Sequence, residues 1–241
     1  MFNFKRLTFR FQVYTNRNPD PGDSYSYLNT IQKQLKEKIR YFVLCRRRDK
    51  FDKNVSIRNK SFQKLIKDID KKNTVGIHPS FTSNQSFDIL CKEYRQLEKT
   101  LDHKIEISRQ HYLKLSLPDT YRNLLRLGIK EDYSMGYSTH TGFRAGIARP
   151  FYFYDLYEEK QTSLRVVPFH IMDRTLLSYL NYSTEQAIKE FEYYSKSIKN
   201  IGGLFVSLWH NTSLNDFEEW QGWQKVFKRM IEINSYNDQV S

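Results

Sequence analysis

The sequence is poor in cysteine and lacks any long apolar run. Cys45 and Cys91 are its only two cysteines, and neither belongs to a C-x-x-C pair. A disulfide framework is therefore excluded, and we expect reduced intracellular thiols. No stretch approaches the roughly 20 apolar residues of a membrane helix, and Met1–Tyr14 lacks the apolar core of a secretory signal. These absences predict a soluble, cytoplasmic chain without a membrane span.

Acidic residues are also scarce relative to basic ones. The chain has 27 Asp plus Glu against 39 Lys plus Arg, a formal net charge of +12. Such a balance attracts polyanions, but the excess is diffuse, and its densest run, Cys45–Lys50, comes without an RNA-binding signature. A nucleic-acid-binding domain thus rests on charge alone, and it would require binding that weakens steeply with salt. We expect a solvated basic face instead.

Apolar residues are spread along the whole chain without a low-complexity linker, which favours one domain over residues 1–241. Hydrophobic residues make up 39% and aromatic residues 15%, enough for a buried core. Apolar periodicity predicts strands at 41–45, 74–78, 104–108, 132–137, 164–169 and 204–209. It predicts helices at 23–38, 62–69, 87–101, 118–128, 184–199 (with Thr184 as N-cap) and 217–233, and a structured loop at 142–156. This alternation is typical of an α/β fold with parallel strands.

Polar side chains follow several of these strands. His78 ends one strand, Arg109 and His111 follow the next, Asp132 lies on the following strand, and His210 comes directly after 204–209. Arg109 and His111 are two residues apart, so an extended backbone points both the same way. Chemistry in α/β folds gathers at the carboxyl ends of strands, and we therefore expect these side chains to meet at one end of the sheet.

Three motifs in order resemble the polysaccharide deacetylase (NodB-homology) family, in a divergent bacterial branch. They are Val75-Gly-Ile-His78, Ser108-Arg-Gln-His-Tyr112 and Leu208-Trp-His-Asn211, and the similarity runs from about Asp20 to Phe227. The resemblance implies a distorted (β/α) barrel with about six or seven parallel strands, whose first strand could be missing from this chain. It also implies one divalent metal, usually zinc, and a carbohydrate substrate with N-acetyl groups.

The resemblance assigns roles to individual residues. His78 matches the first metal histidine, His210 the general acid, and Arg109 the arginine that orients the catalytic aspartate. His111 is the candidate replacement metal ligand, because it shares a face with Arg109. Asp132 is a candidate catalytic base.

Three further residues are candidates for substrate binding, each with a structural alternative. Arg144 could hold a sugar or phosphate, or fix its loop. Trp209 could stack on a sugar, or belong to the core. Asp173 could hydrogen-bond the substrate or His210, or cap the turn after it.

The sequence also departs from the family pattern. Thr82 stands where the second metal histidine would fall, and no Asp-Asp motif occurs in Met1–Asn18. Asp20 and Asp23 are interpreted as a turn and a helix cap. A zinc site needs about three protein ligands, and the motifs supply two histidines. Either the chain is a shortened form of a longer protein or its site is incomplete.

Two classes of function follow. The first is a metal-dependent hydrolase that removes acetyl groups from N-acetylated sugars of a surface polysaccharide, incomplete or inactive as this chain alone. The second is a non-catalytic barrel that binds glycan or protein. A barrel without its first strand would expose two sheet edges, which predicts self-association.

Overall fold

The structure is a computed structural model that describes residues 4–15, 17–18, 20, 22–33, 35, 39–45 and 50–235. Arg46–Asp49 of the basic run therefore lie outside the described residues. No helix in the described ranges is long and apolar enough to cross a membrane.

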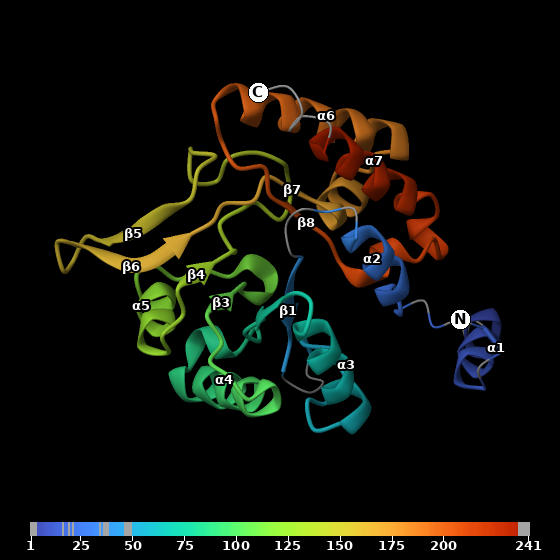
Figure 1. Ribbon diagram of the computed structural model, residues 1–241, viewed down its shortest axis with the longest axis horizontal. Coiled ribbons are helices and arrows are strands. Elements are labelled where there is room, and N and C mark those ends of the chain that lie inside the picture. The colour runs from blue at the N-terminus through green and yellow to red at the C-terminus, as the bar shows by residue number, and fades with distance from the viewer. Residues whose placement is uncertain are drawn as a thin grey trace.

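Two sheets form the framework, and their parallel strands follow one another in chain order (Figure 1). The strands are β1 (Arg40–Val43), β2 (Thr74–Ile77), β3 (Ile107–Ser108), β4 (Glu131–Asp132), β5 (Phe151–Asp155), β6 (Lys160–Val166), β7 (Ile171–Met172) and β8 (Ser207–Leu208). The larger sheet has the order β1-β2-β3-β4-β6-β5, and the smaller one pairs β7 with β8 in parallel. Every pair is parallel except the antiparallel hairpin β5–β6. This arrangement confirms the predicted α/β barrel with parallel strands.

The helices are α1 (Phe4–Tyr14), α2 (Tyr25–Gln32), α3 (Lys60–Asp70), α4 (Phe87–Leu101), α5 (Asp119–Arg126), α6 (Thr184–Asn200) and α7 (Trp223–Ser235). Helices α2 to α7 pack around the two sheets, whereas α1 lies apart from both (Figure 1). Short helical turns lie at η1 (Ser83–Gln85), η2 (His111–Leu113), η3 (Thr175–Tyr179), η4 (Asn211–Leu214) and η5 (Glu218–Trp220). Ile66, Leu97 and Leu124 of α3, α4 and α5 share one buried cluster with the larger sheet. A second cluster, with Phe191 of α6 and Val226 of α7, covers the smaller sheet (Figure 1).

The two sheets meet without a continuous hydrogen-bond ladder. Phe169, between β6 and β7, donates its backbone N–H to Met135 O at 3.1 Å, and His170 donates to Val206 O at 3.0 Å. On the other side, no backbone hydrogen bond joins β1 to β8 among the residues that the structure describes. The barrel therefore has a seam between its first and last strands. Self-association through these edges stays a prediction.

Gly76 fixes the spacing between β2 and β3. A Cβ atom at this position would lie 2.6 Å from Ile107 O and 2.5 Å from a side-chain carbon of the same residue. Only glycine permits so close an approach of the two backbones. The glycine therefore places the ends of β2 and β3, and the polar residues that follow them, side by side.

Several element boundaries differ from the sequence predictions. The predicted loop at 142–156 contains strand β5, along which half-buried Phe and exposed Tyr side chains alternate. The cap of α6 is Ser183, in a capping box with Gln186, and not Thr184. The predicted helix at 217–233 is interrupted before α7, because Gly222 has a φ of +85°.

Candidate functional site

A cavity of about 890 Å³ runs along the seam between β1 and β8 and into the barrel. Its wall includes His78, Arg109, His111 and His210. The structure thus brings together four of the side chains predicted to meet at the strand ends. Most of the remaining wall is apolar or aromatic, from β1, β8, α3 and α7.

His78 is held at the end of β2 by backbone contacts. Its N–H donates to Val43 O at 2.9 Å, and its Nδ1 hydrogen-bonds Arg109 O. A carbonyl can only accept, so we assign the ring proton to Nδ1, which leaves the Nε2 lone pair free. Burial, together with the neighbouring Arg109 charge, holds the pKa of His78 well below its usual value. His78 is therefore a neutral imidazole at pH 7.

His111 lies beside His78 and is held by an aspartate that sequence reasoning missed. The two imidazole rings are 4.8 Å apart, edge to face. Nδ1 of His111 lies 2.6 Å from Oδ1 of Asp52, a fully buried carboxylate that also accepts the Phe81 N–H at 3.0 Å. Burial lowers the pKa of His111 although Asp52 opposes this effect. Asp52 fixes the tautomer, so His111 also keeps its Nε2 lone pair free.

Asp52 lies on the segment between β1 and α3, whose described residues belong to no helix or strand. The only signal that could have found it is its position, on the first segment that follows a buried strand. Carboxylates at that end of a parallel sheet are candidates for chemistry.

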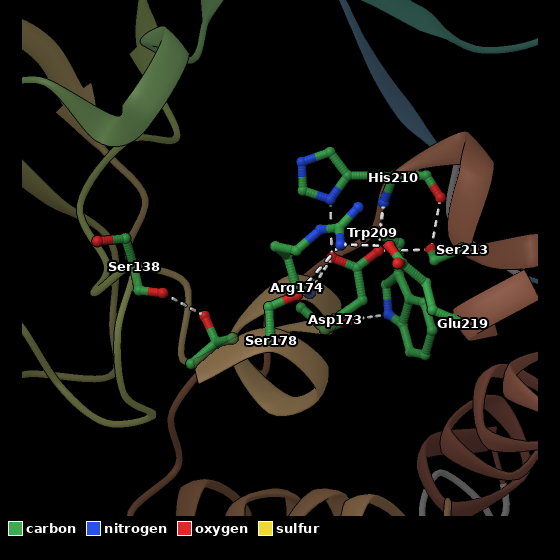
Figure 2. Close-up of polar contacts among 10 residues, drawn as sticks. Ser138, Asp173, Arg174, Ser178, Trp209, His210, Ser213 and Glu219 are labelled. Carbon is green, nitrogen blue, oxygen red and sulfur yellow. Dashed lines mark hydrogen bonds and ion pairs between the residues drawn. The ribbon is translucent and has the colours of Figure 1, made fainter. Parts of the chain in front are cut away.

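His210 forms a second histidine–carboxylate pair on the opposite side of the seam. Figure 2 shows its ring above Asp173, whose Oδ1 is 2.8 Å from Nδ1 while Oδ2 accepts the His210 N–H at 2.6 Å. Ser213 Oγ donates to the same carboxylate. Although burial alone would raise the pKa of Asp173, His210 and these hydrogen bonds lower it. Asp173 is therefore ionised, and it orients a ring that is 41% exposed.

Asp173 thus serves His210 and not a ligand. Its side chain is fully buried and is not part of the cavity wall. The predicted hydrogen bond from Asp173 to His210 is present. A direct substrate contact by Asp173 is incompatible with this burial.

Arg109 occupies the cavity beneath the histidines. Its guanidinium carbon lies 5.2 Å from the centre of the Phe42 ring. Burial lowers the pKa of Arg109 to about 10, partly offset by Asp173 and Asp132. It remains a cation at pH 7. Within the described residues neither aspartate comes close enough to form an ion pair, so Arg109 does not orient a carboxylate directly.

Asp132 and Arg144 lie away from the cavity wall. Asp132 accepts hydrogen bonds from Ser108 Oγ at 2.7 Å and from Ser134 N and Oγ at 2.9 Å, and it is fully buried. Arg144 donates to the carbonyls of Leu113 and Gly136 at 3.3 and 3.2 Å. Both side chains fix loops, so the structure gives no support for a catalytic Asp132 or a substrate-binding Arg144.

Trp209 reaches the cavity wall but belongs to the second core. Its ring stacks on Phe191 at 5.5 Å and meets Phe227 edge to face at 4.9 Å. Its Nε1 donates to Ser207 Oγ at 3.2 Å. These contacts leave packing as the main role of Trp209, with one part of the indole facing the cavity.

No family model and no curated protein matches the sequence. Among solved structures, the chain is similar to a Mycobacterium smegmatis protein assigned as a polysaccharide deacetylase, with a TM-score of 0.66 and 14% identity over 94% of this chain and 78% of that one. The chain has the polysaccharide deacetylase fold. PuuE allantoinase is similar with a TM-score of 0.57 and 12% identity, over 88% of this chain and 65% of its own. At these identities, the likeness to the deacetylase fold confirms the predicted architecture and leaves the chemistry to the site itself.

A divalent metal, which the family resemblance implies, does not fit the described residues. These residues contain no group of three or more His, Cys, Asp or Glu side chains that could hold a metal ion. His78 and His111 each hold Nδ1 in a hydrogen bond and keep Nε2 free, as ligating histidines do, but they supply two ligands where a zinc site needs about three. The neighbouring Arg109 charge also disfavours a second cation. Thr82, at the position of the family's second histidine, is near Ser80 and is not part of the cavity wall.

Proposed function

We propose that this protein is a hydrolase of the polysaccharide deacetylase type that removes acetyl groups from N-acetylated sugars. The proposal is carried by one observation. The histidines of two histidine–carboxylate pairs, Asp52–His111 and Asp173–His210, line the same cavity from opposite sides of the seam. Paired imidazoles with free Nε2 atoms can accept a proton at one point of a reaction and donate a proton at another.

The Asp52–His111 pair is suited to activate water. The pKa of His111 is lowered, so its Nε2 is unprotonated and can accept a proton at neutral pH. Attack of the water on the acetyl carbonyl forms the new C–O bond, and the released proton goes to Nε2. The buried carboxylate of Asp52 stabilises the imidazolium that forms.

The Asp173–His210 pair is suited to protonate the leaving amine. When the C–N bond breaks, its electron pair stays on nitrogen, which takes the Nε2 proton of His210; His210 must therefore enter the reaction as the imidazolium. The products are acetate and the free amino sugar, and exchange of protons with water restores both rings. Asp173 holds His210 by two bonds, to the ring and to the backbone N–H, which fixes the direction of the proton transfer.

A non-catalytic glycan-binding barrel is the second candidate. It is favoured by the lack of a three-ligand metal group among the described residues and by Thr82 at the place of a ligand histidine. The two candidates predict the same fold and the same cavity. They differ in whether the protein releases acetate from the sugar.

Acetate release from N-acetylglucosamine oligomers distinguishes the candidates. Residues 1–241 should be assayed with zinc and with a chelator, alongside His210→Ala and the control His103→Ala. His103 is an exposed histidine that pairs with Asp70 at 2.7 Å outside the cavity. The hydrolase is supported if His210→Ala loses release and His103→Ala keeps it. Binding of the oligomers without any release by the wild type would establish the second candidate.

A further inference from the structure

Among the described residues, no anion is bonded to the guanidinium of Arg109. Its Nε is buried and has no hydrogen-bond partner in this part of the chain. The two carboxylates that influence it are already engaged, Asp173 by His210 and Ser213 and Asp132 by Ser108 and Ser134. Arg109 is half-buried, and a buried Nε–H without a partner costs free energy even where the rest of the guanidinium faces the cavity. Its retention in a cavity wall is therefore typical of a group that waits for a ligand.

The charges of the cavity wall point the same way. The described wall residues include Arg40, Lys53, Arg109 and Arg165 and no aspartate or glutamate. Arg165 is paired with Glu131 at 3.0 Å, and Arg40, the first residue of β1, lies over the Tyr133 ring at 5.5 Å. Arg109 is at the carboxyl ends, on the side of the histidines. At this end Arg109 faces the cavity, whereas the carboxylates of Asp52 and Asp173 are each engaged by a histidine and do not belong to the wall.

The surroundings of Arg109 define the kind of anion. One planar guanidinium matches a planar carboxylate through two parallel hydrogen bonds. The Phe42 ring lies beneath the guanidinium, with 5.2 Å between its centre and the guanidinium carbon, so this aromatic face holds the plane of the guanidinium in place.

We propose that the cavity binds a saccharide that carries a carboxylate, and that Arg109 binds this carboxylate. That the ligand is a saccharide rests on the function proposed above. That it carries a carboxylate rests on Arg109 alone. The hydrolysis proposed above includes no step that uses Arg109. A carboxylate could also come from the acetate that hydrolysis releases, and the test separates these two sources.

Titration calorimetry with glucuronic acid, glucose and acetate tests the proposal. Glucuronic acid and glucose differ only at one carbon, which is a carboxylate in the first. We expect glucuronic acid to bind at least 10-fold more tightly than glucose and acetate. Arg109→Gln should weaken glucuronic acid binding by about 10- to 100-fold, the range for a lost charge-assisted pair. Arg165→Gln is the control, because the Arg165 guanidinium is already paired with Glu131, and it should leave the affinity within about 2-fold.

Four results would overturn the proposal. They are equal affinity for glucuronic acid and glucose, equal affinity for acetate and glucuronic acid, no effect of Arg109→Gln, and an equal loss in Arg165→Gln. Near-UV circular dichroism of both variants shows whether each keeps the fold. If Arg109→Gln does not, Arg109→Lys takes its place in the test, and it should retain part of the affinity because it keeps the charge. Failure of acetate release would reject the hydrolase without changing these binding results.

Discussion

Oδ1 of Asp52 lies 2.6 Å from Nδ1 of His111, although 59 residues separate the two in sequence. The pair is formed because the segment after β1 passes over the ends of β2 and β3. Asp52 also accepts the N–H of Phe81, so its carboxylate links three segments of the larger sheet. A carboxylate in this place determines which nitrogen of His111 is free.

The variant Asp52→Asn should remove the negative charge of this pair. Oδ1 accepts from both His111 Nδ1 and the Phe81 N–H, so the amide oxygen should keep this place, but a neutral side chain no longer stabilises the imidazolium of His111. We expect acetate release to fall by about 100-fold, within the usual range for a positioned base, and ¹⁵N NMR should show a lower pKa of His111 than in the wild type. The matched control is Asp70→Asn at the surface pair with His103, which should change neither measurement. An unchanged rate in Asp52→Asn would remove the pair from the mechanism.

Asp173→Asn should lower stability as well as activity. The ionised carboxylate accepts bonds from His210 and Ser213 and is fully buried, so we expect a loss on the order of 3 kcal/mol in the free energy of unfolding. The pKa of Asp173 is lowered in the folded state. Its stabilisation is therefore present above the unfolded pKa near 4 and is lost as the pH falls through the lower folded pKa. Urea unfolding at about pH 6 and about pH 2.5 should show the difference between wild type and variant shrinking at low pH.

Asp132 should show the opposite dependence on pH. Burial raises the pKa of Asp132 to about 6, so the protonated form favours the folded state. The contribution of Asp132 to the free energy of unfolding should be highest below about pH 4 and fall as the pH rises through about 6. Between about pH 4.5 and 7.5 the fall should be on the order of 2 kcal/mol. Asp132→Asn should lose less stability between these two pH values than the wild type. The same fall in both proteins would show that Asp132 is not the group responsible.

Gly76→Ala should destabilise the fold near the site. The added methyl would meet the Ile107 backbone at 2.6 Å, and relief requires β2 and β3 to separate. We expect a loss of about 1 to 3 kcal/mol, the range for overpacked positions, measured by urea unfolding. Gly146→Ala is the comparison, because its Cβ would meet nothing within 4 Å at a φ of +69°. Its cost should be only that of the backbone conformation, about 1 kcal/mol.

The parallel strands and the histidines at their ends could be predicted from sequence because both depend on local pattern. A buried strand that ends in a polar residue places that residue at the sheet edge, and His78, Arg109, His111 and His210 all follow this rule. Asp132 follows it too, but its side chain turns to Ser108 and Ser134, since alternate residues of a strand face opposite sides.

Asp52 could not be predicted by the same rule. It lies nine residues beyond the last residue of β1, on a segment without periodicity, and only the tertiary structure brings it to His111. The family resemblance directs attention to Met1–Asn18 for an acidic motif, whereas the sheet of the described chain begins at Arg40. Strand β5 is not apparent from the sequence because the glycines and Pro150 that precede it indicate a loop.

The seam between β1 and β8 divides the two histidine–carboxylate pairs between separate hydrogen-bonded units. Asp52 and His111 lie on segments that follow β1 and β3 of the larger sheet, and Asp173 and His210 follow β7 and β8 of the smaller one. The spacing between proton acceptor and proton donor is therefore set by side-chain packing and not by a shared ladder. Local opening of the smaller sheet would separate them without unfolding the rest. A ligand that contacts both pairs would join the two units, so its binding should slow amide hydrogen exchange in β7 and β8.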